Sequence, residues 1–232
     1  MLDRCKGPIR KANSLNQPIS APTPPPAGIR AVIFDLGGVI LRTDDPTPRA
    51  RLAERLGQTR AQLEDIVFAN PVAQRAEEGL ASPEDVWEYV RQALGLRPEE
   101  VRPFRREFFA GDRVDFGLVS LIRSLRPAYR TALLSNTWIV DLPQFLSADL
   151  RIPPDTFDAV ISSARQGAAK PKAAIYQAAL AQLGVPPEQA VFVDDNDRNI
   201  AGARAVGLHT IRFDNPSQTR QALAGYLSLP RR

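Results

Sequence analysis

The stretch Ala31-Val32-Ile33-Phe34-Asp35-Leu36-Gly37-Gly38 begins with four apolar residues and ends with an aspartate, a leucine and a pair of glycines. An apolar run followed by an acidic residue and a glycine turn is typical of a buried parallel strand. Comparable apolar runs occupy residues 131–134, 159–161, 191–193 and 210–213. Helical patterns, for example at 171–183 and 199–206, lie between them. This alternation predicts an α/β fold with a Rossmann-like parallel sheet and helices on both of its faces.

Residues 43–112 differ from the rest of the chain because they show helix signals only. Ser82 precedes Pro83, Glu84 and Asp85, and this order is a helix-capping signature. Glycines occur where helices should stop, at positions 57, 79 and 95. The sequence therefore predicts a small all-helical domain at 43–112, inserted into a core made of residues 29–42 and 113–232.

The first 28 residues hold six of the 21 prolines and no apolar period. Such a segment cannot bury enough surface to offset the entropy of ordering, so we expect a disordered, proline-rich tail. It also lacks the apolar run of a secretory signal, and we therefore expect a cytoplasmic protein.

Charge and composition exclude several classes of protein. Five basic residues and one acidic residue fall within residues 1–30, and the rest of the chain holds 25 of each. The body of the protein thus carries no net charge, which argues against a nucleic-acid partner. No apolar run approaches the roughly 18 residues that span a bilayer, so we expect no membrane partner. A single cysteine and a single histidine exclude an internal disulfide and any mechanism that needs two imidazoles.

Polar side chains follow three of the predicted strands and precede one helix. They are Asp35, Ser135 with Asn136, Lys170, and Asp194 with Asp195. Because ligands bind at the carboxyl ends of parallel strands, we expect these residues to converge there. Carboxylates at one point repel each other unless a divalent cation lies between them, and Mg²⁺ prefers oxygen ligands. The set suits phosphoryl transfer to a carboxylate, with Lys170, Ser135 and backbone amides of the glycine turn, such as that of Gly38, binding phosphate.

Four segments carry a resemblance to a known family. They are residues 32–40, 133–137, 167–171 with Ile175-Tyr176, and 191–195. In this order the segments resemble the haloacid dehalogenase superfamily of hydrolases, over about residues 29–214. The helical block after the first strand is similar to the small cap of one subclass of that superfamily.

The resemblance implies a role for each matching residue. Asp35 would be the nucleophile and a Mg²⁺ ligand, with the backbone carbonyl of Gly37 and the carboxylate of Asp195 as further ligands. Asp194 would act mostly through a water bound to the metal. Ser135 and Lys170 would bind the phosphate, with Asn136 beside them.

The sequence departs from the family pattern at Gly37. Phosphatases of this superfamily usually carry a second aspartate at this position, which serves as general acid and base. The departure leaves metal binding intact, because the position contributes only its backbone oxygen. A well-placed general acid is worth roughly 10²–10⁴-fold in rate. The nearest carboxylate that could replace it is Asp44, just beyond the first strand.

The reading that accounts for all of these residues is a Mg²⁺-dependent phosphatase of a small phosphorylated metabolite, acting through an aspartyl-phosphate. A 2-haloacid dehalogenase would use the same nucleophile and also lacks the second aspartate, but it does not keep paired acidic residues such as Asp194-Asp195. A binding protein that retains the fold with reduced catalysis is the third reading. Two residues near the motifs are given no catalytic role. Asn199 is expected to cap or orient a helix, and Trp138 belongs either to a hydrophobic core or to a substrate platform.

Overall fold

The computed structural model describes residues 28–227. The predicted disordered tail, residues 1–28, therefore lies outside the described residues except for Gly28. None of the helices in the described range has the length and hydrophobicity needed to cross a membrane.

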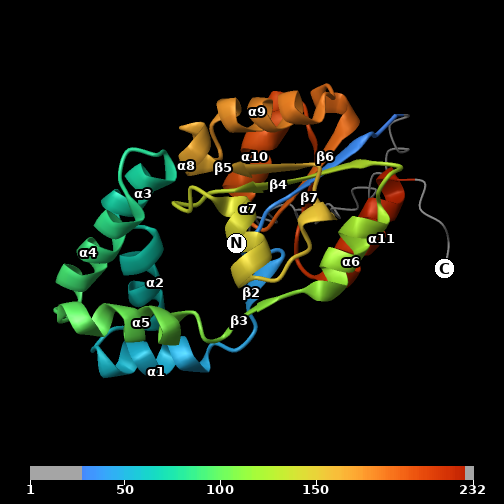
Figure 1. The fold of residues 1–232 in the computed structure, drawn as a ribbon. Coiled ribbons are helices and arrows are strands. Elements are labelled where there is room, and N and C mark those ends of the chain that lie inside the picture. The colour runs from blue at the N-terminus through green and yellow to red at the C-terminus, as the bar shows by residue number, and fades with distance from the viewer. Residues whose placement is uncertain (1–27, 228–232) are drawn as a thin grey trace, which may run out of the picture.

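The centre of the molecule is a five-stranded parallel sheet in the order β5-β4-β1-β6-β7, which confirms the predicted sheet (Figure 1). The strands are β1 (Ala31–Phe34), β4 (Arg130–Ser135), β5 (Ala159–Ser162), β6 (Ala190–Asp194) and β7 (His209–Arg212). The first strand in the sequence lies in the middle, between β4 and β6. All four of its residues are fully buried, as expected for a strand covered on both faces.

Each face of the sheet has its own hydrophobic core, because alternate residues of a strand point to opposite faces. Val32 and Phe34 of β1 belong to one cluster, and Ala31 and Ile33 belong to the other. The helices of the core domain are α6 (Phe116–Ser124), α7 (Leu142–Gln144), α8 (Ser163–Gln166), α9 (Ala173–Leu183), α10 (Asp197–Val206) and α11 (Pro216–Tyr226). Residues of α6, α7 and α11 complete the first cluster, and residues of α9 and α10 complete the second.

A helical insertion lies between two short strands that the sequence analysis did not predict. Strand β2 (Leu41–Thr43) pairs antiparallel with β3 (Asp112–Val114) and forms a two-stranded ribbon. Between them run α1 (Thr47–Arg55), α2 (Arg60–Phe68), α3 (Pro71–Glu77), α4 (Pro83–Ala93) and α5 (Val101–Phe108). We call these five helices and their connecting turns the helical insertion; Figure 1 shows it beside one end of the sheet. Ser82 and Asp85 form the predicted capping box at the start of α4.

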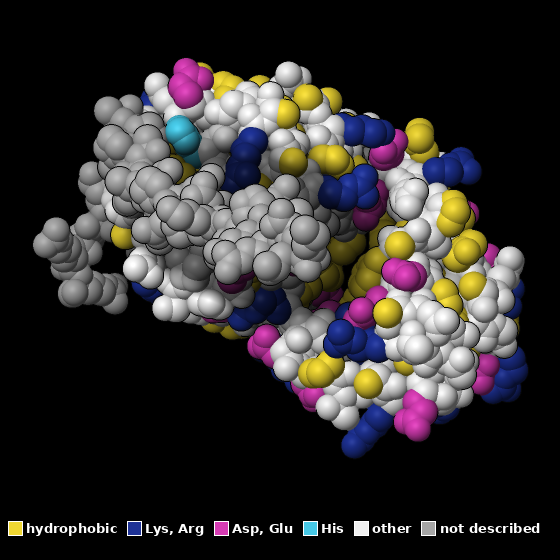
Figure 2. Space-filling view, turned by 180° about the vertical axis from the view of Figure 1, so that it is seen from behind, with side chains coloured by type: hydrophobic (Ala, Val, Ile, Leu, Met, Phe, Trp, Pro, Cys, Tyr) yellow, Lys and Arg dark blue, Asp and Glu magenta, His cyan; other side chains and the backbone are white. Residues whose placement is uncertain are grey.

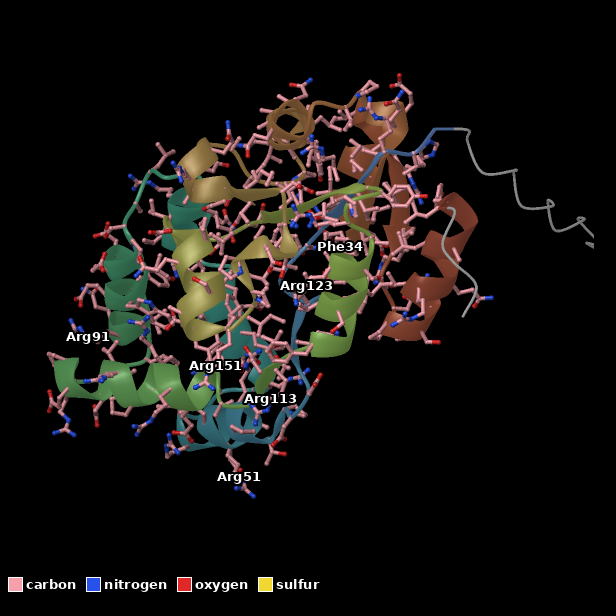
Figure 3. All side chains as sticks on the ribbon, turned by 45° about the vertical axis from the view of Figure 1, so that its right-hand side comes forward. Phe34, Arg51, Arg91, Arg113, Arg123 and Arg151 are labelled. Atoms are coloured by element: carbon pink, nitrogen blue, oxygen red, sulfur yellow. The ribbon has the colours of Figure 1, made fainter. Side chains whose placement is uncertain are left out.

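Shorter turns complete the described chain. Single 3₁₀ turns occur at Pro98–Glu100, Pro154–Thr156 and Pro187–Gln189, and a π turn follows α7 at Phe145–Asp149. The apolar and charged side chains are separated as expected: Phe34 lies inside the sheet, whereas Arg51, Arg113 and Arg123 lie exposed on the outside (Figure 3).

One glycine of α10 fixes the distance between this helix and the turn that carries Lys170. A Cβ added at Gly202 would lie 2.6 Å from the carbonyl oxygen of Pro171 and 2.7 Å from its Cβ. No atom lies within 4 Å of the same position at Gly225, in α11. These two helical glycines therefore form a matched pair.

We expect Gly202→Ala to lower the free energy of unfolding by about 1–3 kcal/mol, since it forces backbone apart in a packed region. Alanine is otherwise favoured over glycine inside a helix by about 1 kcal/mol. Gly225→Ala should accordingly be neutral or stabilising. Urea unfolding of both variants measures the difference, and equal stabilities would contradict this account of the α10 contact.

Candidate active site

The candidate site lies at the carboxyl ends of the three central strands. Asp35 follows β1, Ser135 ends β4 and Asp194 ends β6. The register aligns Phe34 with Leu133 on one side and with Val193 on the other, so the residues that follow meet at one edge. The expected convergence of these side chains from distant parts of the sequence is present in the structure.

Lys170 lies between two of the carboxylates. Its Nζ is 2.7 Å from Oδ1 of Asp35 and 2.7 Å from Oδ2 of Asp194, and its side chain is only 1% exposed. Burial acts to lower the pKa of Lys170, but the two carboxylates outweigh it and raise this pKa above its ordinary value. A buried ammonium paired in this way stays charged.

Burial acts on the pKa of Asp35 in the opposite direction from its action on the pKa of Lys170. It raises the pKa of Asp35 to about 7, although the ammonium of Lys170 and the N–H of Leu36 both act to lower it. The Leu36 N–H donates to Oδ1 of Asp35 at 2.7 Å, on the same oxygen that contacts Lys170. One carboxylate oxygen of Asp35 is thus held by two donors, which fixes the orientation of the other.

Asp195 adds a third carboxylate to the cluster. Oxygen atoms of Asp35, Asp194 and Asp195 lie within 4.8 Å of one another. Burial and the neighbouring charge of Asp194 raise the pKa of Asp195. A Cβ at Gly38 would lie 2.1 Å from Oδ2 of Asp195, so this carboxylate can approach only because residue 38 is a glycine. Three carboxylates facing a single lysine leave negative charge uncompensated, and such an oxygen set could hold a divalent cation.

Asn199 plays a part that the sequence analysis did not identify. Its Nδ2 donates to both carboxylate oxygens of Asp194 at 3.1 Å, whereas Asn196 is the residue that caps α10. The hydroxyl of Tyr176 in turn donates to the backbone oxygen of Asn199 at 2.8 Å. Asp194 is therefore fixed from two sides, by Lys170 and by Asn199. Its own position after an apolar strand was readable from sequence, but its amide partner five residues later was not.

Asn136 fixes the backbone of Lys170. Its Nδ2 donates to the carbonyl oxygen of Lys170 at 3.0 Å, and its Oδ1 accepts from the N–H of Lys170 at 2.8 Å. Ser135 is buried beside it, with only a long 3.4 Å contact from its Oγ to the carbonyl of Asn136. The N–H of Gly38 donates to the carbonyl of Leu41, so it stabilises the turn instead of pointing a free donor at a phosphate.

Two positions bear on a general acid, Gly37 and Asp44. A Cβ at Gly37 would meet no atom within 4 Å, so a side chain at this exposed position would have room. The side chain of Asp44 is 53% exposed, and its Oδ1 is 3.7 Å from Nε of Arg42. Asp44 is thus not a member of the carboxylate cluster, and its predicted role as proton donor stays a prediction.

We expect Lys170→Met to lower the free energy of unfolding by about 3–5 kcal/mol, because it leaves two buried carboxylates without their counter-charge. The matched control is Lys172→Met: Lys172 is 59% exposed and pairs with Glu78, and loss of a surface pair costs less than about 1 kcal/mol. Thermal unfolding at neutral pH compares the two variants.

The pH dependence gives a second test of the same interaction. A carboxyl whose pKa rises from 3.8 to about 7 on folding binds its proton more tightly in the folded chain, so its contribution to stability is lost as the pH rises through this interval. Loss of Lys170 raises this pKa further. The loss of unfolding free energy caused by Lys170→Met should therefore be smaller at pH 5 than at pH 8. A loss that stays the same at both pH values would contradict the pairing.

The chain is similar in sequence to known phosphatases. The chain is 29% identical over 209 residues to the D-ribitol-5-phosphate phosphatase of Bacteroides thetaiotaomicron, an alignment that covers 86% of this chain and 99% of that protein. It is 27% identical over 182 residues to a sesquiterpene phosphatase of Aspergillus oryzae, covering 77% and 87% of the two chains.

Solved structures share the fold. A HAD family enzyme of Bacteroides thetaiotaomicron, in complex with magnesium and inorganic phosphate, matches with a TM-score of 0.67 at 22% identity, over 83% of this chain and 99% of that one. The family model of haloacid dehalogenase-like hydrolases matches residues 29–207, which include every carboxylate of the cluster and Lys170. The chain therefore belongs to the haloacid dehalogenase-like hydrolases.

Proposed function

We propose that this chain is a Mg²⁺-dependent phosphatase that hydrolyses a small phosphorylated metabolite through a phosphoryl group carried on Asp35. The observation that supports it most directly is the contact of Lys170 with Asp35 and Asp194, with Asp195 completing a cluster of carboxylates. Relatives of similar length are phosphatases by name, and one structural neighbour binds magnesium and phosphate.

The residues of the cluster fit a magnesium ion. Asp35, Asp195 and the backbone carbonyl of Gly37 would hold it, and Asp194 would act through a bound water. The donor set consists of oxygen atoms alone, which is the preference of Mg²⁺, and the glycine at position 38 leaves room for Asp195 to approach. When bound, the ion supplies positive charge to the carboxylates and to the phosphate oxygens.

The chain's own residues account for the transfer step. The oxygen of Asp35 that is not held by Leu36 and Lys170, Oδ2, attacks phosphorus while the bond from phosphorus to the leaving oxygen breaks. The ammonium of Lys170 and the hydroxyl of Ser135 stabilise negative charge on the transferring group. A water molecule then attacks the phosphorus of the acyl phosphate, releases phosphate and restores the carboxylate of Asp35.

A haloacid dehalogenase is the alternative that Gly37 favours, because its aspartate attacks carbon and needs no proton donor at that position. Asp194 argues against it, since this residue is fully buried and held by Lys170 and Asn199 next to a further carboxylate. Displacement of halide by a carboxylate needs no metal ion, so it does not account for this group of acidic side chains. A binding protein without turnover is the other alternative, and the same assay separates all three.

We expect hydrolysis of p-nitrophenyl phosphate in the presence of Mg²⁺, loss of this activity on exhaustive chelation, and its return when Mg²⁺ is restored. Asp35→Asn should abolish turnover while thermal unfolding shows an intact fold, because an amide is not a usable nucleophile. Fluoroberyllate should bind to Asp35 in the wild-type protein. Full activity after chelation would contradict the metal assignment, and a covalent adduct on another carboxylate would contradict the nucleophile.

Substitutions of the two acidic residues at the end of β6 should differ in their effect on the Mg²⁺ requirement. Asp195 is half-buried and makes no hydrogen bond through its side chain to another described residue, so Asp195→Asn should raise the Mg²⁺ concentration needed for half-maximal activity by about tenfold or more. Asp194→Asn should raise it less, since Lys170 and Asn199 already occupy the oxygens of Asp194. A Mg²⁺ titration of both variants measures the order, and the reverse order would overturn it.

A further inference from the structure

The turn that ends α3 contacts the core next to the catalytic lysine. Oε1 of Glu78 is 2.5 Å from Nζ of Lys172, and a Cβ at Gly79 would lie 2.5 Å from the carbonyl oxygen of Ala164. Both core partners belong to the segment from α8 to α9 that carries Lys170. Figure 1 shows α3 beside α8. This turn of the insertion therefore lies against the segment that carries Lys170.

A second contact holds the insertion on the core from another side. Trp138, in the loop after Ser135, packs on the small cluster of Ala73 and Ala76 from α3. Its ring stacks on Phe68 with centroids 6.0 Å apart and meets Trp87 edge-on at 6.4 Å. The space-filling view shows the hollow between core and insertion, with apolar and acidic side chains inside it (Figure 2). Both α3 and the turn that follows it thus contact the core.

Glu77 is the residue of this turn that lacks a partner. It is half-buried, and within residues 28–227 its carboxyl forms no hydrogen bond and no ion pair. Burial raises the pKa of Glu77 to about 7, with the nearby ammonium of Lys170 acting to lower it and Glu78 acting to raise it. The ammonium of Lys172, at the start of α9, pairs with Glu78 and not with Glu77. Glu77 is therefore a half-buried carboxyl without a partner in the described part of the chain, on a turn whose next two residues, Glu78 and Gly79, lie against the segment that carries Lys170.

The site lacks a proton donor for the leaving group at position 37. Residue 37 has no side chain, and the space where its Cβ would lie is open. An alkoxide leaving group is a strong base and departs slowly unless it is protonated as the bond breaks. The core residues that surround Asp35 offer Lys170 for this purpose, but its ammonium is committed to Asp35 and Asp194.

We propose that Glu77 of the helical insertion is the general acid and base of this enzyme and replaces the side chain that position 37 lacks. The inference rests on the proposed phosphatase function. As Oδ2 of Asp35 bonds to phosphorus, the leaving oxygen takes the proton of Glu77 and departs as an alcohol. The Glu77 carboxylate then accepts a proton from the water that attacks the acyl phosphate, so that phosphate is released and Glu77 returns to its acid form.

The decisive experiment compares two substrates with the full-length protein and Mg²⁺. Glu77→Gln should lower kcat/KM for a primary alkyl phosphate by about 10²-fold or more, and for 2,4-dinitrophenyl phosphate by less than about threefold, because dinitrophenolate leaves without a proton. kcat/KM is the right quantity, since it reports only the steps up to the first phosphoryl transfer. Equal losses on both substrates, or no loss on either, would overturn the proposal.

Two control variants separate proton donation from docking and from the competing carboxylate. Glu78→Gln removes the contact with Lys172 and should lower kcat/KM for both substrates in the same proportion. Asp44→Asn should leave the ratio between the substrates unchanged. A selective loss on the alkyl ester in Asp44→Asn, with none in Glu77→Gln, would assign the acid to Asp44 and overturn the proposal.

The open space at position 37 permits a further check. In the Gly37→Asp background a carboxyl is supplied from the core, so Glu77→Gln should cost less than about tenfold on the alkyl phosphate instead of about 10²-fold. An equal cost in both backgrounds would show that Glu77 does not act as the proton donor. Failure of the proposed function is a distinct outcome, because the wild-type protein would then hydrolyse neither phosphate.

Discussion

The contact of Lys170 with Asp35 and Asp194 is the interaction on which the rest of the site depends. An ammonium with a side chain that is 1% exposed can exist only beside compensating charge, and the ends of two neighbouring strands supply it. The same ammonium keeps two carboxylates close together where they would otherwise repel. The contact requires β1 and β6 to be neighbours in the sheet, and β1 lies between β4 and β6.

Neutral groups then hold the charged ones in place. Asn136 binds the backbone of Lys170 through both ends of its amide, and Asn199 binds both oxygens of Asp194. Gly202 allows α10 to lie against the backbone of Pro171, the residue after Lys170. Each of these residues fixes the geometry of the site without adding charge. The charge balance between Lys170 and the three carboxylates is therefore unchanged by them.

The sequence was sufficient to predict those parts of the molecule that follow from local pattern. Apolar runs that end in Asp35, Ser135 and Asp194 marked the strands and their shared edge, because a strand buried on both faces must be continuously apolar. The ribbon of β2 and β3 was missed, since strands of three residues with polar side chains carry no periodic signal. The role of Asn199 was missed for a different reason: which helix residue faces a carboxylate depends on tertiary packing.

Glu77 is a further residue whose surroundings depend on tertiary packing and do not follow from the sequence pattern. In the sequence it is one of two adjacent glutamates on a polar helix end, and such residues ordinarily lie in solvent. Its burial arises because Gly79 permits close approach to the backbone of Ala164 and because Trp138 reaches out of the core to pack on α3. An acid carried on the insertion differs from one at position 37 in a further respect. It is carried to the site by the contact between the insertion and the core, so proton transfer would depend on that contact.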